Sequence, residues 1–371
     1  MECKFISNGI AVWYDQIIKP CCIWKNDDTN KKENHIEIID FTKWRANLKD
    51  SNSKLGTNEW LNNCENCKTI ESYGRDGSNR VNSNYSYSHY SDDDITLEIR
   101  PGNTCNFACQ TCWPEASSKV FNYYKTSGLL TGEQNQNKLD NFDFLLPLSD
   151  KIRDVVLLGG EPFYDKSCLK FLAWAETNLS ANLTIFTNGS YINWDFIENY
   201  KGKLIIVVSL DAIGKAAEYI RYGTIWEEVY ANFQKLRQYS NVEVRVNITL
   251  SSWNYIDVEP LIELLCQDWP DVVTFGRPSY KYQNEVSIPY NFRDEIKESL
   301  NRAISTIDMS DIEQGQKSHA KNALLNIVDN LSIDNYDHNE YNYLKDFAQK
   351  MDKVKKISMK DHCKFLFKML S

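Results

Sequence analysis

The stretch Cys105-Asn-Phe-Ala-Cys109-Gln-Thr-Cys112-Trp113 places three cysteines in the pattern CxxxCxxC. Three thiolates can hold a cubane iron–sulfur cluster by three of its four irons, whereas electron-transfer clusters take four cysteines and are coordinatively closed. The fourth iron stays open for a further ligand, as one position of a catalytic zinc site does. A zinc knuckle is the alternative, but it needs a fourth Cys or His nearby, and none follows Cys112 until Cys168.

Composition favours a soluble, cytoplasmic protein that keeps its thiols reduced. The chain has 371 residues, of which 42% are hydrophobic, enough for two or three domains or one large core with extensions. Its first residues lack the basic start and apolar run of a signal peptide, and no apolar stretch approaches the length of a membrane span. Eleven cysteines, an odd number, fit metal thiolates better than a disulfide framework.

Charge is unevenly distributed along the chain. The formal net charge of −9 gives a nucleic-acid substrate no general electrostatic help. Residues 343–371 hold eight lysines against three aspartates, a local excess of +5 that leaves −14 for the rest. A lysine-rich terminal helix is usually a solvated face, and it could also dock an acidic partner or substrate. The sequence leaves this choice open.

Six short β-branched runs indicate parallel βα units, because helix-length segments separate most of them. The middle runs are almost continuously apolar, as expected for strands covered on both faces. The runs are 95–100, 154–158, 183–187, 204–209, 242–249 and 272–276. After Pro289 the pattern predicts helices at roughly 291–308, 316–331 and 339–356.

Candidate binding motifs follow three of these runs, where βα folds gather their chemistry. Gly159-Gly160-Glu161-Pro162 follows the second run, Thr187-Asn188-Gly189 the third, and Ser209-Leu-Asp211 the fourth, with Arg221 downstream. Each has an ordinary explanation by itself: a βα turn, an Asn-Gly turn or a surface salt bridge. Their order behind CxxxCxxC is much more specific than any one of them.

Together these segments resemble the radical S-adenosylmethionine (SAM) superfamily. The resemblance implies an α/β fold, a partial (β/α)6 barrel, with a [4Fe–4S] cluster on the catalytic residues Cys105, Cys109 and Cys112. In the family the open iron chelates the amino and carboxylate groups of SAM. The resemblance also implies cofactor contacts from Gly159, Gly160, Glu161, Pro162, Thr187, Asn188, Ser209, Asp211 and Arg221.

Two positions depart from the family pattern. Ala212 stands where the Ser-Leu/Ile-Asp-Gly segment has glycine. In many relatives an aromatic residue directly before the third cluster cysteine packs on adenine, but here that residue is Thr111 and an aromatic, Trp113, follows the cysteine. The sequence therefore leaves open which residue contacts adenine. The alternative for Trp113 is a place in the core.

The amino-terminal cysteines form a second group: Cys3, Cys21, Cys22, Cys64 and Cys67. They resemble the SPASM/twitch extension, which carries auxiliary clusters and usually follows the barrel. The resemblance implies one auxiliary [4Fe–4S] cluster on Cys3, Cys21, Cys64 and Cys67, with Cys22 spare or exchanging with Cys21. Zinc on the same four thiolates is the competing interpretation. Cys168, Cys266 and Cys363 are expected to be small buried hydrophobes.

The predicted organisation has four parts: a Cys-rich segment at 1–75, a linker at 76–94, the radical SAM barrel at 95–285 and a helical region at 286–371. The five histidines form no motif-spaced pair. Because Cys3 is nearly the first residue, we expect no leader-binding domain ahead of it.

The resemblance implies reductive cleavage of SAM to a 5′-deoxyadenosyl radical, which abstracts hydrogen from a substrate C–H bond. The expected substrate is a peptide or protein, and the expected reductant is an external one-electron donor of the flavodoxin or ferredoxin type. One alternative is dehydrogenation or epimerisation of a small molecule such as an amino sugar or nucleoside. Another is a non-catalytic zinc or iron–sulfur protein. A nucleic-acid substrate is disfavoured by the charge.

Overall fold

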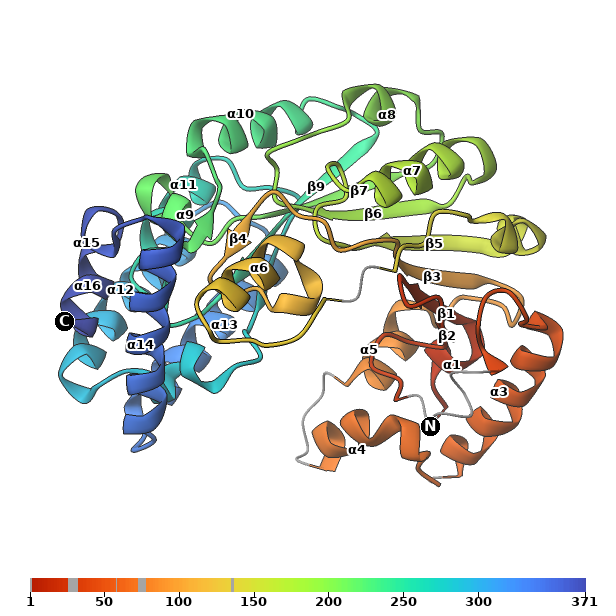
Figure 1. Ribbon diagram of the computed structural model, residues 1–371, viewed down its shortest axis with the longest axis horizontal. Helices are drawn as coiled ribbons and strands as arrows, with labels where there is room; N and C mark the ends of the chain where they lie inside the picture. The colour runs from red at the N-terminus through yellow and green to blue at the C-terminus, as the bar shows by residue number, and fades with distance from the viewer. Residues whose placement is uncertain (1, 26–32, 58, 73–77, 135–136) are drawn as a thin grey trace. The chain divides into compact units, whose positions relative to one another are not determined.

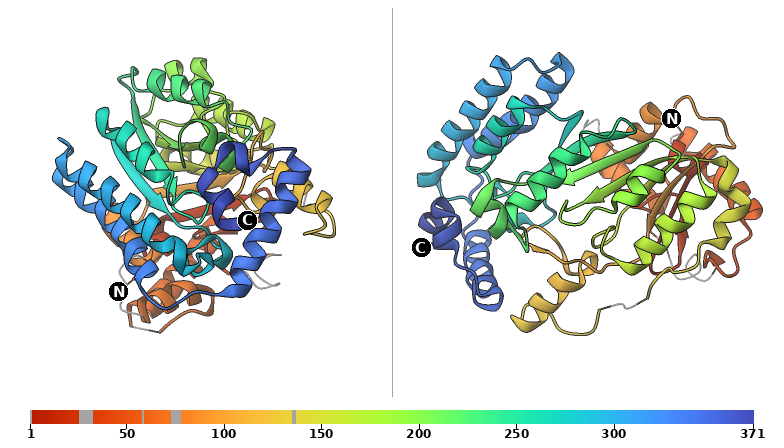
Figure 2. Two further views of the ribbon diagram at one scale, coloured as in Figure 1. Left: turned by 90° about the vertical axis from the view of Figure 1, so that its left-hand side faces the viewer. Right: turned by 90° about the horizontal axis from the view of Figure 1, so that it is seen from above.

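The computed structural model describes residues 2–25, 33–57, 59–72, 78–134 and 137–371 (Figures 1 and 2). It confirms the predicted α/β class: a mostly parallel sheet with surrounding helices, consistent with a partial barrel, and a helical carboxyl-terminal region. The chain divides into two compact units, which are described one at a time. Unit 1 comprises Met1–Asn103, Gln136–Ile185 and Trp194–Leu204, and unit 2 comprises Thr104–Asn135, Phe186–Asn193 and Ile205–Ser371.

All six predicted runs are strands. They are β3 (Ile95–Arg100), β5 (Ile152–Leu157), β6 (Asn182–Thr187), β7 (Leu204–Ser209), β9 (Val242–Thr249) and β10 (Val272–Gly276). The helices between them are α6 (Ser118–Thr126), α7 (Lys166–Asn178), α8 (Trp194–Asn199), α9 (Gly214–Ile220), α10 (Trp226–Leu236) and α11 (Val258–Gln267). Strand side chains such as Val155, Ile185 and Val246 are fully buried, so burial of these runs positions the loops that follow them.

Unit 1 contains a strand that the sequence did not predict. β1 (Gly9–Trp13) pairs in parallel with β3, with Ile10 opposite Leu97, and β2 (Ile18–Lys19) pairs antiparallel with β1. The order within the unit is β6-β5-β3-β1-β2. β1 is one short apolar run, which periodicity alone cannot assign to a strand, and its hydrogen-bond partner lies more than eighty residues away in the sequence.

The segment predicted as a linker contains a helix. α5 (Asn79–Ser86) lies within residues 76–94 and packs on α1 (Lys4–Asn8). The Lys4 amide donates to Asn84 Oδ1 at 3.1 Å, and Cys3 Sγ lies 3.7 Å from Ser83 Oγ. The other helices of the Cys-rich segment are α3 (Phe41–Gly56), the 3-10 turn η1 (Asn62–Cys64) and α4 (Glu65–Ser72). This part of the chain is therefore folded against the amino-terminal helix.

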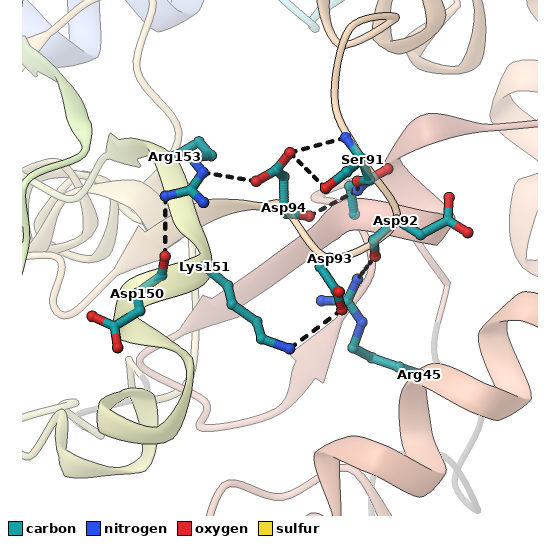
Figure 3. A network of polar contacts seen from close by, with 9 residues as sticks. Arg45, Ser91, Asp92, Asp93, Asp94, Asp150, Lys151 and Arg153 are labelled. Carbon is teal, nitrogen blue, oxygen red and sulfur yellow. Dashed lines mark hydrogen bonds and ion pairs between the residues drawn. The ribbon is translucent and has the colours of Figure 1, made fainter.

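A polar network fastens the amino ends of β3 and β5 within unit 1 (Figure 3). Asp94 accepts hydrogen bonds from the Ser91 amide at 2.9 Å and from Arg153 Nε at 2.7 Å. These contacts with Ser91 and Arg153 lower the pKa of Asp94 to about 2. Lys151 pairs with Asp93 at 3.3 Å. In a parallel βα fold this end of the strands serves stability rather than chemistry.

Unit 2 holds the remaining strands and the terminal helices. β9 and β10 pair in parallel, β7 lies next to β9, and β4 (Ala108–Cys109) pairs antiparallel with β8 (Arg221–Tyr222). The helices predicted after Pro289 are confirmed as α12 (Tyr290–Met309), α13 (Gln314–Ser332) and α14 (His338–Lys355), followed by α15 (Met359–His362) and α16 (Lys364–Leu370). α12 packs against α11 and α13, and α14 lies beside α6 (Figures 1 and 2).

Short 3-10 turns complete the chain at η2 (Pro114–Ala116), η3 (Asp143–Lys151), η4 (Lys281–Gln283) and η5 (Glu285–Ser287). The prediction of buried cysteines is confirmed for Cys168 and Cys363, whereas Cys266 is partly exposed. In the described parts of the chain, no helix combines the length and apolar character that a membrane crossing requires.

Candidate functional site

The CxxxCxxC segment of unit 2 is held by a short pairing that brings Arg221 beside it. In the two-stranded β4–β8 sheet, Cys109 lies opposite Arg221 and Ala108 opposite Tyr222. The Gln110 amide extends the pairing by donating to the Ile220 carbonyl at 2.8 Å. A residue predicted to contact SAM is thus fixed next to a predicted cluster ligand by backbone hydrogen bonds.

Cys105, Cys109 and Cys112 are partly exposed as residues, and the Cys112 thiol lies close enough to the other two for their charges to affect its pKa. Burial raises the pKa of Cys112, and the charges of Cys109 and Cys105 raise it further. Burial also raises the pKa of Cys109, while Arg221 and then Lys355 act to lower it. The Phe107 amide donates to Cys105 Sγ at 3.4 Å. Cations and an amide near sulfur favour the thiolate form that a metal cluster requires.

Lys355 is a site residue that the sequence analysis missed. It is the last residue of α14 and is only 4% exposed. Its Nζ donates to the Ala108 carbonyl at 2.8 Å and to Gln110 Oε1 at 3.1 Å, so it holds both neighbours of Cys109. Burial lowers the pKa of Lys355 to about 7, although the charge of Cys109 opposes the shift. The lysine-rich tail gave no sign that one of its lysines is buried.

Asn188 ties the segment after β6 to the cysteine segment within unit 2. Its Nδ2 donates to Asn106 Oδ1 at 2.9 Å, and Asn106 Nδ2 donates to Ser190 Oγ at 2.8 Å. Gly189 has φ +77°, and an added Cβ would lie 3.1 Å from Val208, so glycine is required there. Thr187 Oγ1 accepts from the Gly189 amide at 3.1 Å. The predicted Thr-Asn-Gly segment is therefore a turn that also contacts the residue after Cys105.

Asp211 and Arg221 form a buried ion pair at 2.9 Å. Asp211 Oδ1 also accepts from the Thr249 amide at 2.7 Å, so both carboxylate oxygens of Asp211 are engaged within the protein. Burial acts to lower the pKa of Arg221, but the charges of Cys109 and Asp211 outweigh it and raise this pKa. Arg221 Nε is buried and has no hydrogen-bond partner among the described residues. A carboxylate bound beside Arg221 would satisfy this donor, since guanidinium groups bind carboxylates well.

The Gly159-Gly160-Glu161-Pro162 segment lies in unit 1, directly after β5. A Cβ added at Gly159 would lie 3.0 Å from Cys168 Sγ and 3.1 Å from the Gly102 carbonyl, so glycine permits this close approach. Glu161 is 1% exposed, and its Oε1 accepts from the Phe163 amide at 3.3 Å. Gly159 and Gly160 are partly exposed, and Pro162 is buried.

The exposure of Ser209 and Trp113 tests two further expectations from the sequence. Ser209 lies at the end of β7 and is partly exposed, as a ligand contact requires. Trp113 is 40% exposed, so the alternative that it is a core residue is wrong. The three residues that follow it form the 3-10 turn η2, and this turn leaves the indole outside the core.

The second cysteine group lies in unit 1. Burial raises the pKa of Cys21, with further increases from the charges of Cys22 and Cys3, and it raises the pKa of Cys64 to about 12, with Cys3 and Cys67 adding to it. Cys3, Cys21, Cys64 and Cys67 are thus within range of one another's charges. Arg80, whose Nη2 pairs with Glu71 and whose guanidinium lies 4.5 Å from the centre of the Trp60 ring, acts to lower the pKa of Cys64.

In neither cysteine group are the described side chains already arranged as metal ligands. Within the described ranges, no three or more His, Cys, Asp or Glu side chains are placed to hold a metal ion. The donor chemistry nevertheless fits a cluster, because each group gathers thiols with a cation beside them. The cysteine spacing and this gathering carry the assignment, and we expect metal binding to draw the sulfur atoms together.

Comparisons with known proteins identify one part of the chain. The family described as Radical SAM superfamily matches residues 99–265. No curated protein sequence matches the chain. Among solved structures, Streptococcus suis SuiB bound to S-adenosylmethionine is similar at 16% identity and TM-score 0.36, over 58% of this chain and 45% of SuiB.

Two other solved structures are similar at the same low level. Native anSMEcpe with bound AdoMet matches at 16% identity and TM-score 0.39, over 57% of this chain and 60% of that one. TYW1 with a lysine-pyruvate adduct bound matches at 15% identity and TM-score 0.39, over 69% and 86%. The chain thus spans 45% and 60% of the length of SuiB and anSMEcpe. Residues 99–265, which carry CxxxCxxC and the motifs after β5, β6 and β7, are a radical SAM superfamily domain.

Proposed function

We propose that this chain is a radical SAM enzyme that cleaves SAM reductively and uses the resulting 5′-deoxyadenosyl radical to abstract hydrogen from a C–H bond of a peptide or protein. One observation carries the proposal: the β4–β8 pairing sets Arg221 opposite Cys109. The two residues come from motifs that are more than a hundred positions apart in the sequence. Their pairing sets a cation beside a thiol, which supports a shared role in binding a cluster and SAM.

The residues of unit 2 fit a [4Fe–4S] cluster and SAM. Cys105, Cys109 and Cys112 would hold the cluster, which, when reduced by an external one-electron donor, supplies the electron that breaks the carbon–sulfur bond of SAM to give methionine and the radical. Arg221 would bind the SAM carboxylate through its unpartnered Nε–H, since Asp211 already fixes the other end of its guanidinium. Asn188 and Lys355 would keep the cysteine segment in place.

Further SAM contacts are proposed for residues at the carboxyl ends of β5, β6 and β7. Exposed backbone at Gly159 and Gly160 suits the SAM amino group, because glycines let a ligand approach the main chain closely. Glu161 and Pro162 would shape that turn, and Thr187 and Ser209 would contact SAM directly. These contacts orient the cofactor and keep water away from a reactive intermediate.

The amino-terminal cysteines are proposed to hold one auxiliary [4Fe–4S] cluster of the SPASM/twitch type. The proposed ligands are Cys3, Cys21, Cys64 and Cys67, with Cys22 spare or exchanging with Cys21. An auxiliary cluster would accept an electron from the substrate radical, making the enzyme an oxidoreductase. The peptide assignment rests on the resemblance of this segment to that extension, and a cytoplasmic location suits oxygen-sensitive clusters and reduced thiols.

The test is anaerobic purification, iron and sulfide quantitation, and a dithionite-driven assay for 5′-deoxyadenosine. About eight irons per chain with 5′-deoxyadenosine formed would establish both clusters. About four irons that are lost together on replacing Cys105, Cys109 and Cys112 with Ala would make the amino-terminal group a zinc site or a partial site. Zinc alone, with no 5′-deoxyadenosine, would show that the chain is a non-catalytic binding protein.

A further inference from the structure

A patch of exposed lysines lies at the end of α14, next in the chain to the buried Lys355. The terminal lysine patch consists of Lys353, Lys356, Lys360 and Lys364, all of which are exposed. In the portion of the chain that the structure describes, none of the four forms a salt bridge. Lys350 and Lys368, by contrast, are neutralised by Asp346 and Glu295. The patch therefore carries four lysine charges against one exposed carboxylate within it, that of Asp361.

The patch is joined to the cysteine segment through α14. Lys355 ends the helix, and Lys356 follows it with φ +54°. The Lys355 side chain reaches the Ala108 carbonyl at 2.8 Å, and its own carbonyl accepts from Tyr222 Oη at 2.7 Å. Both contacts are made to β4 and β8, the strands that carry Cys109 and Arg221. One residue of backbone and one lysine side chain thus separate the patch from the segment that would hold the cluster.

Position and charge together indicate what the patch binds. Electron transfer slows steeply with distance, so a reductant must approach the cluster segment closely. Residues 1–342 carry a net charge of −14, and they would repel an acidic protein. The lysine-rich end, residues 343–371, has an excess of +5 and attracts such a protein. Resting on the proposed function, we propose that the terminal lysine patch docks an acidic one-electron carrier protein and brings it to the cluster segment.

The experiment compares two charge reversals of equal size in the anaerobically prepared holoenzyme. The first replaces patch residues: Lys353→Glu, Lys356→Glu and Lys360→Glu. The matched control replaces three exposed lysines of unit 1: Lys43→Glu, Lys138→Glu and Lys201→Glu. The probe is an acidic bacterial flavodoxin. Its dissociation constant in the oxidised form and its rate of cluster reduction in the reduced form are measured at low and high salt.

We expect reduced flavodoxin to associate more slowly with the patch variant and therefore to reduce its cluster at least about tenfold more slowly at low salt, because charge steering changes association rates by 10- to 1000-fold. The difference from wild type should shrink at high salt, and the control variant should stay near wild type. Glutamine at the same three patch positions should give an intermediate loss. Thermal midpoints of all variants identify any loss caused by unfolding.

Three outcomes would overturn the docking proposal. They are equal losses in both charge-reversal variants, a flavodoxin-driven rate in wild type that salt does not change, and unchanged flavodoxin kinetics with a raised KM for an acidic peptide substrate. The last outcome would indicate that the patch binds the substrate rather than the electron carrier. Dithionite needs no docking surface, so dithionite-driven formation of 5′-deoxyadenosine should be the same in every variant. Its absence from wild type would contradict the proposed function instead.

Discussion

The two cysteine groups of this chain differ in the charges that surround their sulfur atoms. Cys109 lies beside two buried cations, Arg221 from β8 and Lys355 from α14. Cys64 in the amino-terminal group has one opposing cation, Arg80, and that guanidinium is already paired with Glu71. Burial raises the thiol pKa in both groups, and among the described residues the first group has a cation, Arg221, with a buried donor that lacks a partner.

This difference would distinguish a metal site that binds a further ligand from a metal site whose coordination is complete. An Arg donor without a protein partner is costly when buried, and a ligand carboxylate would satisfy it. Four thiols with a cation committed elsewhere need no further ligand once metal is bound. The comparison teaches that the surroundings of the cysteines, as well as their number, would distinguish the proposed catalytic cluster from the proposed auxiliary one.

The largest expected effect is on SAM cleavage, and it depends on which of the two cysteine groups loses a ligand. Cys105→Ala should reduce 5′-deoxyadenosine formation to background, because two thiolates cannot hold the open cluster that SAM requires. Cys64→Ala should keep SAM cleavage and lose only the metal of the amino-terminal group. Dithionite assays and metal analysis of both variants measure this. Loss of SAM cleavage in Cys64→Ala with a fully loaded first cluster would break the distinction.

Replacing the unpartnered arginine should weaken SAM binding. Arg221→Met removes a charge-assisted hydrogen bond of about 1.5–3 kcal/mol, so the dissociation constant of SAM should rise roughly 10- to 100-fold. Calorimetric titration of the holoenzyme with SAM checks the change. Arg80→Met is the matched variant in the other group.

The Arg221 variant also leaves Asp211 buried without its partner, which is destabilising. The double variant Arg221→Met/Asp211→Asn removes this charge and should recover stability without recovering SAM affinity. SAM affinity equal to wild type in a folded Arg221→Met protein would show that the guanidinium does not contact the cofactor.

Removing the buried lysine should have a moderate effect. Lys355→Met leaves the Ala108 carbonyl and Gln110 Oε1 without their donor, which should lower the free energy of unfolding by about 1–3 kcal/mol. Loss of the positive charge should also make the cluster harder to reduce. Denaturant unfolding and an EPR-monitored redox titration measure the two effects. Lys353→Met, at an exposed position of the same helix, should change neither.

The smallest effect is expected at Asn188. Asn188→Ala deletes the hydrogen bond to Asn106, worth about 1 kcal/mol, so SAM affinity should fall by less than tenfold. Asn182→Ala is a suitable control, because Asn182 bonds Asp154 on the exposed side of unit 1. A loss at Asn188 larger than the loss at Arg221 would indicate that Asn188 contacts SAM directly rather than holding the cysteine segment.

Long elements were predictable because their signals are local. The runs at 95–100, 204–209 and 242–249 coincide with β3, β7 and β9. Burial on both faces leaves a continuous apolar run in β7, and burial on alternate positions leaves an alternating pattern in β9. β4 and β8 could not be predicted in this way. Each has two residues, and their pairing joins positions 109 and 221, so no window of sequence contains the information.

The lysine-rich segment at residues 343–371 shows the same limit of sequence-based prediction at the level of single side chains. Its composition predicts a solvated helix, and Lys353 and Lys356 are indeed exposed. Lys355 is also a lysine and stands between these two in the sequence. It is nevertheless buried, because its side chain donates to the Ala108 carbonyl. Sequence patterns report average exposure along a helix and give no information about which distant carbonyl a side chain meets.

By itself, the sequence determined the α/β class, the strand and helix positions and the cysteines and motifs that identify a radical SAM domain, because periodicity and spacing are properties of neighbouring residues. Only the tertiary structure decided that Arg221 lies opposite Cys109 with a free donor, that Lys355 supports the cysteine segment from the far end of the chain, and that α5 folds onto α1. These are contacts between distant segments, and packing and hydrogen bonding select them only when the whole chain has folded.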